Sequence, residues 1–100
     1  MSDTERVSLD DLSGAGRQSL FEGEPKTVRL ALDAGEEVPP HQHPERDIVC
    51  HLLSGDLSLR LGSETVALSA GEVVRFDGEQ DISPRAETEC EALLVLAPAV

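Results

Sequence analysis

GEEVPPHQHPERDIVCHLLSG, residues 35–55, contains all three histidines of the 100-residue chain. Prolines at positions 39, 40 and 44 favour an extended backbone around His41 and His43, because proline fixes its own φ and pushes the preceding residue out of the helical region. On an extended backbone, two residues separated by one point to the same side. Neutral imidazole is the commonest metal ligand in proteins, so His41 and His43 are predicted to share a metal ion. Two solvated histidines in a proline-rich loop are the alternative.

The spacing of this segment resembles the first sequence motif of the cupin superfamily, G-x5-H-x-H-x3–4-E-x6-G. Gly35 and Gly55 match its framing glycines, and the histidine pair matches in full. The glutamate does not: Ile48 stands at its position, and the acid Asp47 lies one residue earlier. A bulge would be needed to turn Asp47 to the same side as the histidines, because a one-residue slip reverses the face that a strand residue occupies.

The second cupin motif, G-x5-P-x-G-x2-H-x3-N, has a partial counterpart in residues 71–84. Its histidine position holds Ile82, or Asp81 if Gly78 is aligned with the second glycine, and its proline and asparagine are missing. The resemblance spans roughly residues 26–98. Because positions of the motif's metal ligands differ, the resemblance indicates the fold more strongly than it indicates a metal site or a reaction.

This resemblance implies an all-β fold, a small antiparallel jelly-roll β-barrel, with a pocket in which cupins hold a divalent transition metal such as Fe, Mn, Ni or Zn. His41 and His43 would be ligands, and Asp47, His51, Asp81 or water would complete the coordination sphere. Asp47 and His51 are four residues apart on an extended run and share a face, so they would be ligands only as a pair. The alternative for His51 is a hydrogen bond within a subunit contact.

Hydrophobic alternation agrees with this fold class. Short apolar runs recur about every ten residues, separated by turn signals and without a helical period, which is typical of an antiparallel barrel or sandwich. The runs are residues 27–32, 48–53, 57–61, 65–68, 73–76 and 90–96. We expect residues 1–23 to form a polar N-terminal arm and residues 24–100 a single barrel domain.

Charge and composition exclude some functions. The chain has twenty acidic residues and eight Lys or Arg residues, which gives a net charge of −12. Such self-repulsion is tolerated in strong salt, where the Debye length shrinks to about 3 Å at 1 M, so the chain resembles a protein of a salt-adapted, halophile-like microbe. Nucleic acid is not an expected partner, because phosphate binding requires clustered Lys and Arg, and the chain has no Trp or Tyr for base stacking.

The sequence also predicts a soluble, cytoplasmic protein. No apolar run approaches the roughly 20 residues that cross a bilayer, and residues 1–5 lack the features of a signal peptide. Cys50 and Cys90 lie in apolar runs, where buried free thiols are expected. By alternation Cys50 shares a face with Ile48 and Leu52, and if that face is the barrel interior, its sulfur lies near the histidine pair.

Two classes of function remain open. One is a metal-dependent enzyme acting on a small molecule, in which the ion serves as a Lewis acid or activates oxygen. The other is a non-catalytic barrel that binds or senses a small ligand without metal. The serines lack a neighbouring His and acid pattern, so no catalytic residue is assigned. The apolar runs at residues 48–53 and 90–96 carry more apolar surface than the interior of one small barrel holds, so a homodimer is expected. A membrane is not an expected partner.

Overall fold

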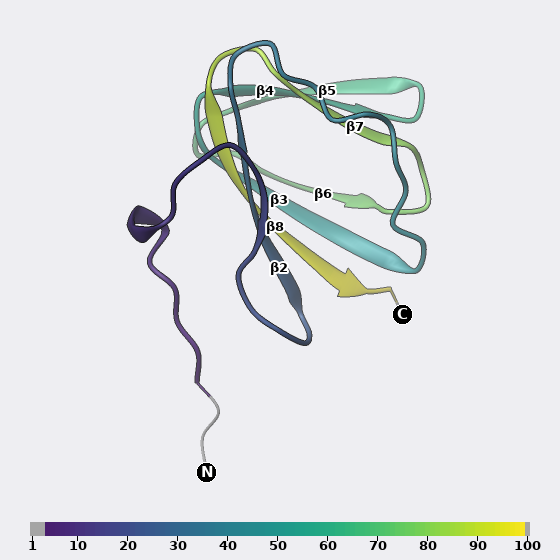
Figure 1. Cartoon of the computed structure of the whole chain (residues 1–100). Coiled ribbons are helices and arrows are strands. Elements are labelled where there is room, and N and C mark those ends of the chain that lie inside the picture. The colour runs from purple at the N-terminus through teal and green to yellow at the C-terminus, as the bar shows by residue number, and fades with distance from the viewer. Residues whose placement is uncertain (1–3, 100) are drawn as a thin grey trace.

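The computed structural model describes residues 4–99, and nearly all of its regular structure is β-strand (Figure 1). The one helical turn in this range is a 3-10 turn, η1 (Leu9–Asp11). The strands are β1 (Gly16–Ser19), β2 (Lys26–Leu32), β3 (Arg46–Ser54), β4 (Asp56–Leu61), β5 (Glu64–Ser69), β6 (Val73–Asp77), β7 (Ile82–Ala86) and β8 (Cys90–Pro98). The all-β prediction is confirmed. Nothing helical in residues 4–99 has the length or hydropathy to cross a membrane.

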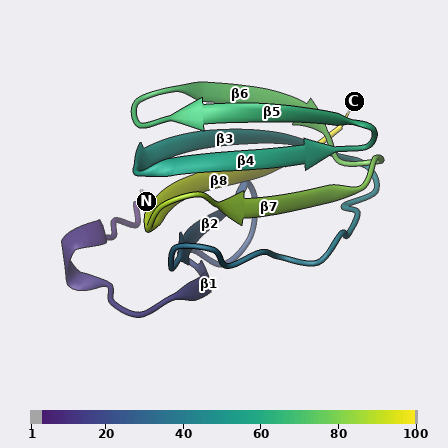
Figure 2. The same cartoon turned by 90° about the horizontal axis from the view of Figure 1, so that it is seen from above.

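The strands form two antiparallel sheets that face each other. One sheet has five strands in the order β1-β2-β8-β3-β6, and the other has three in the order β5-β4-β7. Figure 1 shows β4, β5 and β7 lying over β3, β6 and β8, and Figure 2 shows both layers from above. The structure is therefore a jelly roll of two layers, with its core between them.

Alternation along each strand decides which side chains enter that core. In β3, Ile48, Cys50 and Leu52 are buried while the residues between them are half-buried or exposed. The central strand β4 repeats the pattern with Leu57 and Leu59, each 1% exposed. Burying an aliphatic side chain of this size stabilises the fold by about 1.5–3 kcal/mol, so these inward rows fix both the pairing and the register.

The segment between β2 and β3 crosses from one sheet to the other and runs beside β7. The amide of Val38 donates to the carbonyl of Pro84 at 2.8 Å, and His41 exchanges backbone hydrogen bonds with Ile82 in both directions, at 3.1 and 2.8 Å. The amide of His43 then donates to the carbonyl of Gly78 at 2.8 Å. The histidine segment is thus extended, as its prolines predict, and anchored along its length.

Gly78 allows this close approach. A Cβ at this position would overlap the carbonyl oxygen of His43 and would lie 2.9 Å from that of Arg46. Glycine is required here by lack of space, since its φ is not in the left-handed region. Gly55, in contrast, combines a φ of 82° with a backbone approach from Glu89, so both space and conformation favour glycine there.

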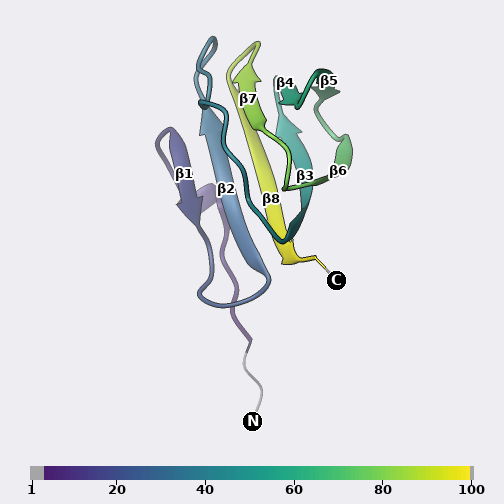
Figure 3. The same cartoon turned by 90° about the vertical axis from the view of Figure 1, so that its right-hand side faces the viewer.

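Residues 16–19, within the expected N-terminal arm, form the edge strand β1 beside β2 (Figure 3). On the outer face of the sheet, Arg29 donates to Gln18 at 2.8 Å and to the carbonyl of Gly14 at 3.1 Å, which ties the N-terminal segment to the sheet.

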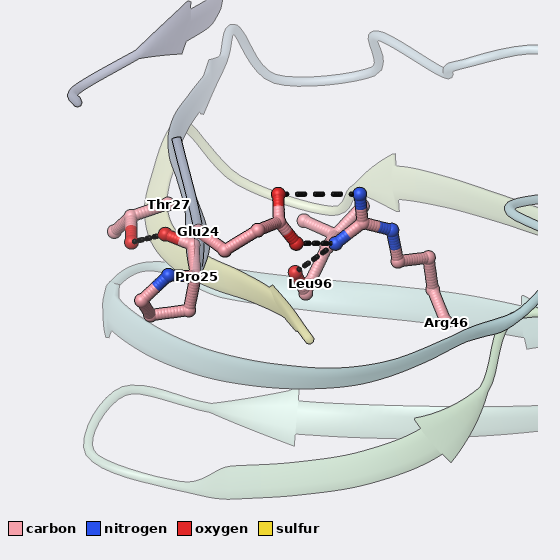
Figure 4. Close-up of polar contacts among 5 residues, drawn as sticks. All are labelled: Glu24, Pro25, Thr27, Arg46 and Leu96. Carbon is pink, nitrogen blue, oxygen red and sulfur yellow. Dashed lines mark hydrogen bonds and ion pairs between the residues drawn. The ribbon is translucent and has the colours of Figure 1, made fainter. Parts of the chain in front are cut away.

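A second attachment lies at the other end of β2, in the loop that joins it to β1. Glu24 pairs with the guanidinium of Arg46, which also donates to the carbonyl of Leu96 at 2.9 Å (Figure 4). In the same loop, the Thr27 hydroxyl donates to the carbonyl of Pro25 at 3.0 Å. These contacts hold the loop of the β1–β2 hairpin against the ends of β3 and β8.

Candidate functional site

A pocket of about 500 Å³ opens between the two sheets, and its walls are largely apolar. The five-stranded sheet contributes Leu30, Ile48 and Leu96, and the three-stranded sheet contributes Leu57 and Leu59. The histidine segment that crosses between the sheets supplies two imidazoles to the wall. The volume of the pocket lies within the range of small-molecule sites, which are typically apolar with a few oriented polar groups.

His41 and His43 both line this pocket and are both half-buried. Their rings meet edge to face, with centroids 4.8 Å apart and planes at 87°. Nδ1 of His41 lies 3.0 Å from the carbonyl of Pro39. A carbonyl can only accept, so Nδ1 carries the proton, and in the neutral imidazole the lone pair is then on Nε2. Such a hydrogen bond to the second ring nitrogen is the usual way in which a metal-binding histidine is oriented.

The environment of His43 favours its neutral, metal-binding form. Partial burial lowers the pKa of the His43 imidazole, and the positive charges of His41, Arg17, Lys26 and Arg46 lower it further. Burial disfavours the charged imidazolium, and nearby cations repel it. Both effects favour the form of His43 that keeps a lone pair for a metal ion.

Cys50 also lines the pocket, on the inward face of β3 predicted from alternation. Burial raises the pKa of its thiol to about 12, with a smaller contribution from Cys90. Both cysteines are buried free thiols. Because the thiolate is the metal-binding form, a thiol held neutral in this way is a poor donor next to two neutral imidazoles.

Asp47 and His51 lie on the opposite face of β3 from the pocket. Asp47 is exposed beside Asp77 of β6, and His51 is half-buried between Val73 of β6 and Leu93 of β8. The register of β3 shifts only between Leu52 and Ser54, beyond both residues, so no bulge turns them inward. The structure does not bring them to the histidine pair.

Asp81 is exposed, and its carboxylate accepts a hydrogen bond from the side chain of Gln42 at 3.0 Å. Gln42 alternates with the two histidines, so Asp81 serves to hold the segment from its outer side. Across residues 4–99, no group of three or more His, Cys, Asp or Glu side chains gathers where it could hold a metal ion. A metal here would have two protein ligands, with its other positions left to water or a bound molecule.

One pocket residue was not predicted from the sequence. Arg17 of β1 lines the pocket from the edge of the five-stranded sheet, although its segment was expected to be an arm. Arg29, Arg60 and Arg75 do not line it. Only the pairing of β1 with β2 brings Arg17 to the site.

A family model described as a cupin domain matches residues 28–96, more than two thirds of the chain. The chain belongs to the cupin family. The matched range includes the histidine segment and every strand from β3 to β7, so the resemblance seen in the first motif extends through the fold. No curated protein matches this cupin significantly in sequence.

Solved structures agree with the family. The cupin is similar to the TT1209 protein of Thermus thermophilus, with 24% identity, a TM-score of 0.84 and coverage of 97% of this chain and 100% of that one. An RmlC-like cupin protein from Desulfovibrio desulfuricans is 25% identical, with a TM-score of 0.76 and coverage of 100% and 99%. KdgF from Halomonas sp. is 21% identical, with a TM-score of 0.71 and coverage of 84% and 80%. These likenesses confirm the predicted jelly-roll fold.

Proposed function

We propose that this cupin binds a divalent transition metal through Nε2 of His41 and of His43, at the wall of a pocket that takes a small molecule. The observation that carries the proposal is the pairing of the two rings on one pocket wall, with Nδ1 of His41 held by the carbonyl of Pro39. Imidazole donors suit Fe, Ni and Zn better than the hard cations Mg and Ca.

The donor set also limits the affinity. Two imidazoles fit a metal ion with several open positions, whereas the cupin motif supplies a glutamate and a further histidine that are Ile48 and Ile82 or Asp81 here. When bound, the ion would supply Lewis acidity to a ligand in the pocket. The chain itself would favour the neutral form of His43, orient His41 through Pro39 and exclude water with its apolar walls.

Zinc titration and elemental analysis would test this proposal. Wild-type protein, stripped with chelator and reloaded with Zn²⁺, should retain about one equivalent, and His41→Ala with His43→Ala should abolish retention. His51→Ala is the matched control, because His51 is a half-buried histidine on the opposite face of β3. Retention below about a tenth of an equivalent by reloaded wild type would contradict the proposal. An equal loss in His51→Ala would contradict the assignment to the pair.

A metal-free binding barrel is the second candidate. The observation in its favour is the absence of a third donor beside the histidines within residues 4–99, together with the apolar walls. In that case the histidines would hydrogen-bond a ligand directly. The same titration separates the two functions, since only the metal-binding cupin gains thermal stability from Zn²⁺ in proportion to its affinity.

We further propose that a second copy of the chain covers the outer face of the five-stranded sheet. Val73 is 59% exposed there, and His51, Leu93 and Val95 are half-buried without a covering layer. Asp47, Asp77 and Glu91 lie on the same face around this strip, so two copies could meet along its apolar centre with the acidic side chains at the margin. Light scattering in strong salt should give twice 10.7 kDa, whereas a 10.7 kDa particle contradicts the dimer.

The acidic composition supports a further proposal, that this cupin works in the cytoplasm of a salt-adapted cell. Its melting temperature should rise as KCl is added, because screening reduces the repulsion among its acidic side chains. A melting temperature that is flat or falling between dilute buffer and molar KCl would contradict adaptation to salt.

A further inference from the structure

The pairings of β2 with β1 and with β8 place two cations on the pocket side of the five-stranded sheet. Arg17 lies directly opposite Leu30, and Lys26 directly opposite Leu96 of β8. Leu30 and Leu96 both line the pocket. Residues directly opposite each other in an antiparallel pair point to the same face, so Arg17 and Lys26 share the inner face with the pocket walls.

Arg17 differs from Arg29 and Arg46 in having no acidic partner. Arg29 is paired with Glu91, and Arg46 with Glu24. Within residues 4–99 the guanidinium of Arg17 makes neither an ion pair nor a side-chain hydrogen bond, although it lines the pocket. Lys26 already interacts with an acidic side chain, since its charge helps to lower the pKa of the Glu24 carboxyl. Arg17 is therefore available to an anion in the pocket.

Arg17 brings a positive charge to the pocket although the chain has 20 acidic and 8 Lys or Arg residues. Of the Lys and Arg residues in the range 4–99, only Arg17 lines the pocket, and no acidic side chain lines it. A concave site with a cation and apolar walls concentrates ligands of the opposite sign.

From this placement we infer that the pocket takes a small monocarboxylate with an apolar body. Its carboxylate lies against Arg17 and the histidine pair, and its carbon skeleton lies between the sheets against Leu57, Leu59 and Phe76. Guanidinium is the side chain best shaped to receive a carboxylate, through two parallel hydrogen bonds. The apolar walls exclude sugars and other polyols, whose hydroxyls would lose their hydrogen bonds with water.

The inference deepens the proposed function and rests on its pocket, but not on the metal ion. Calorimetry with chelator-treated protein and three eight-carbon probes tests it: octanoate, 1-octanol and octylammonium. Wild type should bind octanoate more tightly than octanol and should not bind octylammonium. Arg17→Gln should weaken octanoate roughly tenfold to a hundredfold, since charge-assisted hydrogen bonds contribute a factor of this size.

Arg75→Gln is the matched control, because Arg75 is an exposed arginine on the outer face of β6 and its replacement changes the net charge equally. Arg17→Lys keeps the charge and should keep the preference for octanoate over octylammonium, provided that its melting temperature matches wild type. Equal affinity for octanoate and octanol, equal loss in the two Gln variants, or no octanoate binding by wild type each overturns the inference. Zinc retention by the histidine pair is measured separately, so the proposed function can stand when the inference fails.

Discussion

Nε of Arg29 donates to the carboxylate of Glu91 at 2.5 Å, across the β2–β8 pair on the outer face of the five-stranded sheet. Arg29 is only 7% exposed, although it lies on the face away from the core. Its Nη1 donates to the side chain of Gln18 and to the carbonyl of Gly14. One guanidinium thus joins β8, β2 and the N-terminal segment.

Arg29→Ala should lower the free energy of unfolding by about 2–4 kcal/mol. Removing one partner of a largely buried pair leaves the other charge without compensation, and the side chain's packing is lost as well. Because the Glu91 side chain is 27% exposed, we expect a smaller loss of stability than breaking a fully buried pair would cause. Urea denaturation measures the change. Arg60→Ala, at an exposed position on β4, is the control and should change the free energy of unfolding by less than about 0.5 kcal/mol. Equal effects of the two substitutions would contradict the role assigned to Arg29.

Gly78→Ala should destabilise the protein by about 1–3 kcal/mol, the usual cost of overpacking. The added methyl group would displace the carbonyl of His43 and move the histidine segment away from β7. Zinc retention should fall together with the melting temperature, because His43 sits on the displaced segment. A variant with wild-type melting temperature and wild-type zinc retention would show that this close approach does not hold the site.

The thiol of Cys50 should resist alkylation in the folded protein. With a pKa of about 12, roughly one thiol in ten thousand is ionised at pH 8, and the thiolate is the reactive form. Peptide mass spectrometry after iodoacetamide treatment should find Cys50 unmodified in native protein and fully modified in urea. Fast modification of Cys50 without unfolding would contradict its burial in the pocket wall.

Glu24 should make stability depend on pH through its pairing with Arg46. Hydrogen bonding to Arg46 lowers the pKa of the Glu24 carboxyl below its ordinary value of 4.5. Its contribution to stability is therefore present above that value and is lost as the pH falls through the lower, folded-state pKa. Glu24→Gln should reduce the melting temperature at pH 7, and the difference from wild type should vanish in acid.

Glu22→Gln, in the same loop and exposed, is the control for this experiment. Its melting temperature should follow wild type across the whole pH range. A Glu24→Gln variant that differs from wild type by the same amount at pH 7 and in strong acid would contradict the electrostatic explanation.

The sequence predicts much of this fold because its strands alternate cleanly. Leu57, Leu59 and Leu61 enter the core at every second position, and a two-residue turn at Gly62 and Ser63 joins β4 to β5. Prolines around His41 fix the extended segment for a local reason, the restriction of φ. Such features depend on neighbouring residues, so they can be inferred without the tertiary structure.

The rest of the site depends on contacts between distant segments. Gly16–Ser19 has no apolar alternation of its own and becomes a strand only by pairing with β2, so the position of Arg17 could not be predicted. The direction of His51 was open until β3 was paired on both sides. Its outward position follows from the burial of Cys50 and Leu52, its two neighbours in the chain.

Anomalous diffraction from a zinc-loaded crystal tests the central claim most directly. We expect a zinc peak about 2.0–2.1 Å from Nε2 of both His41 and His43, inside the pocket, with water or a carboxylate in the remaining positions. A peak at Asp47 or His51 with none at the pair, or no peak at full zinc loading, would contradict the account.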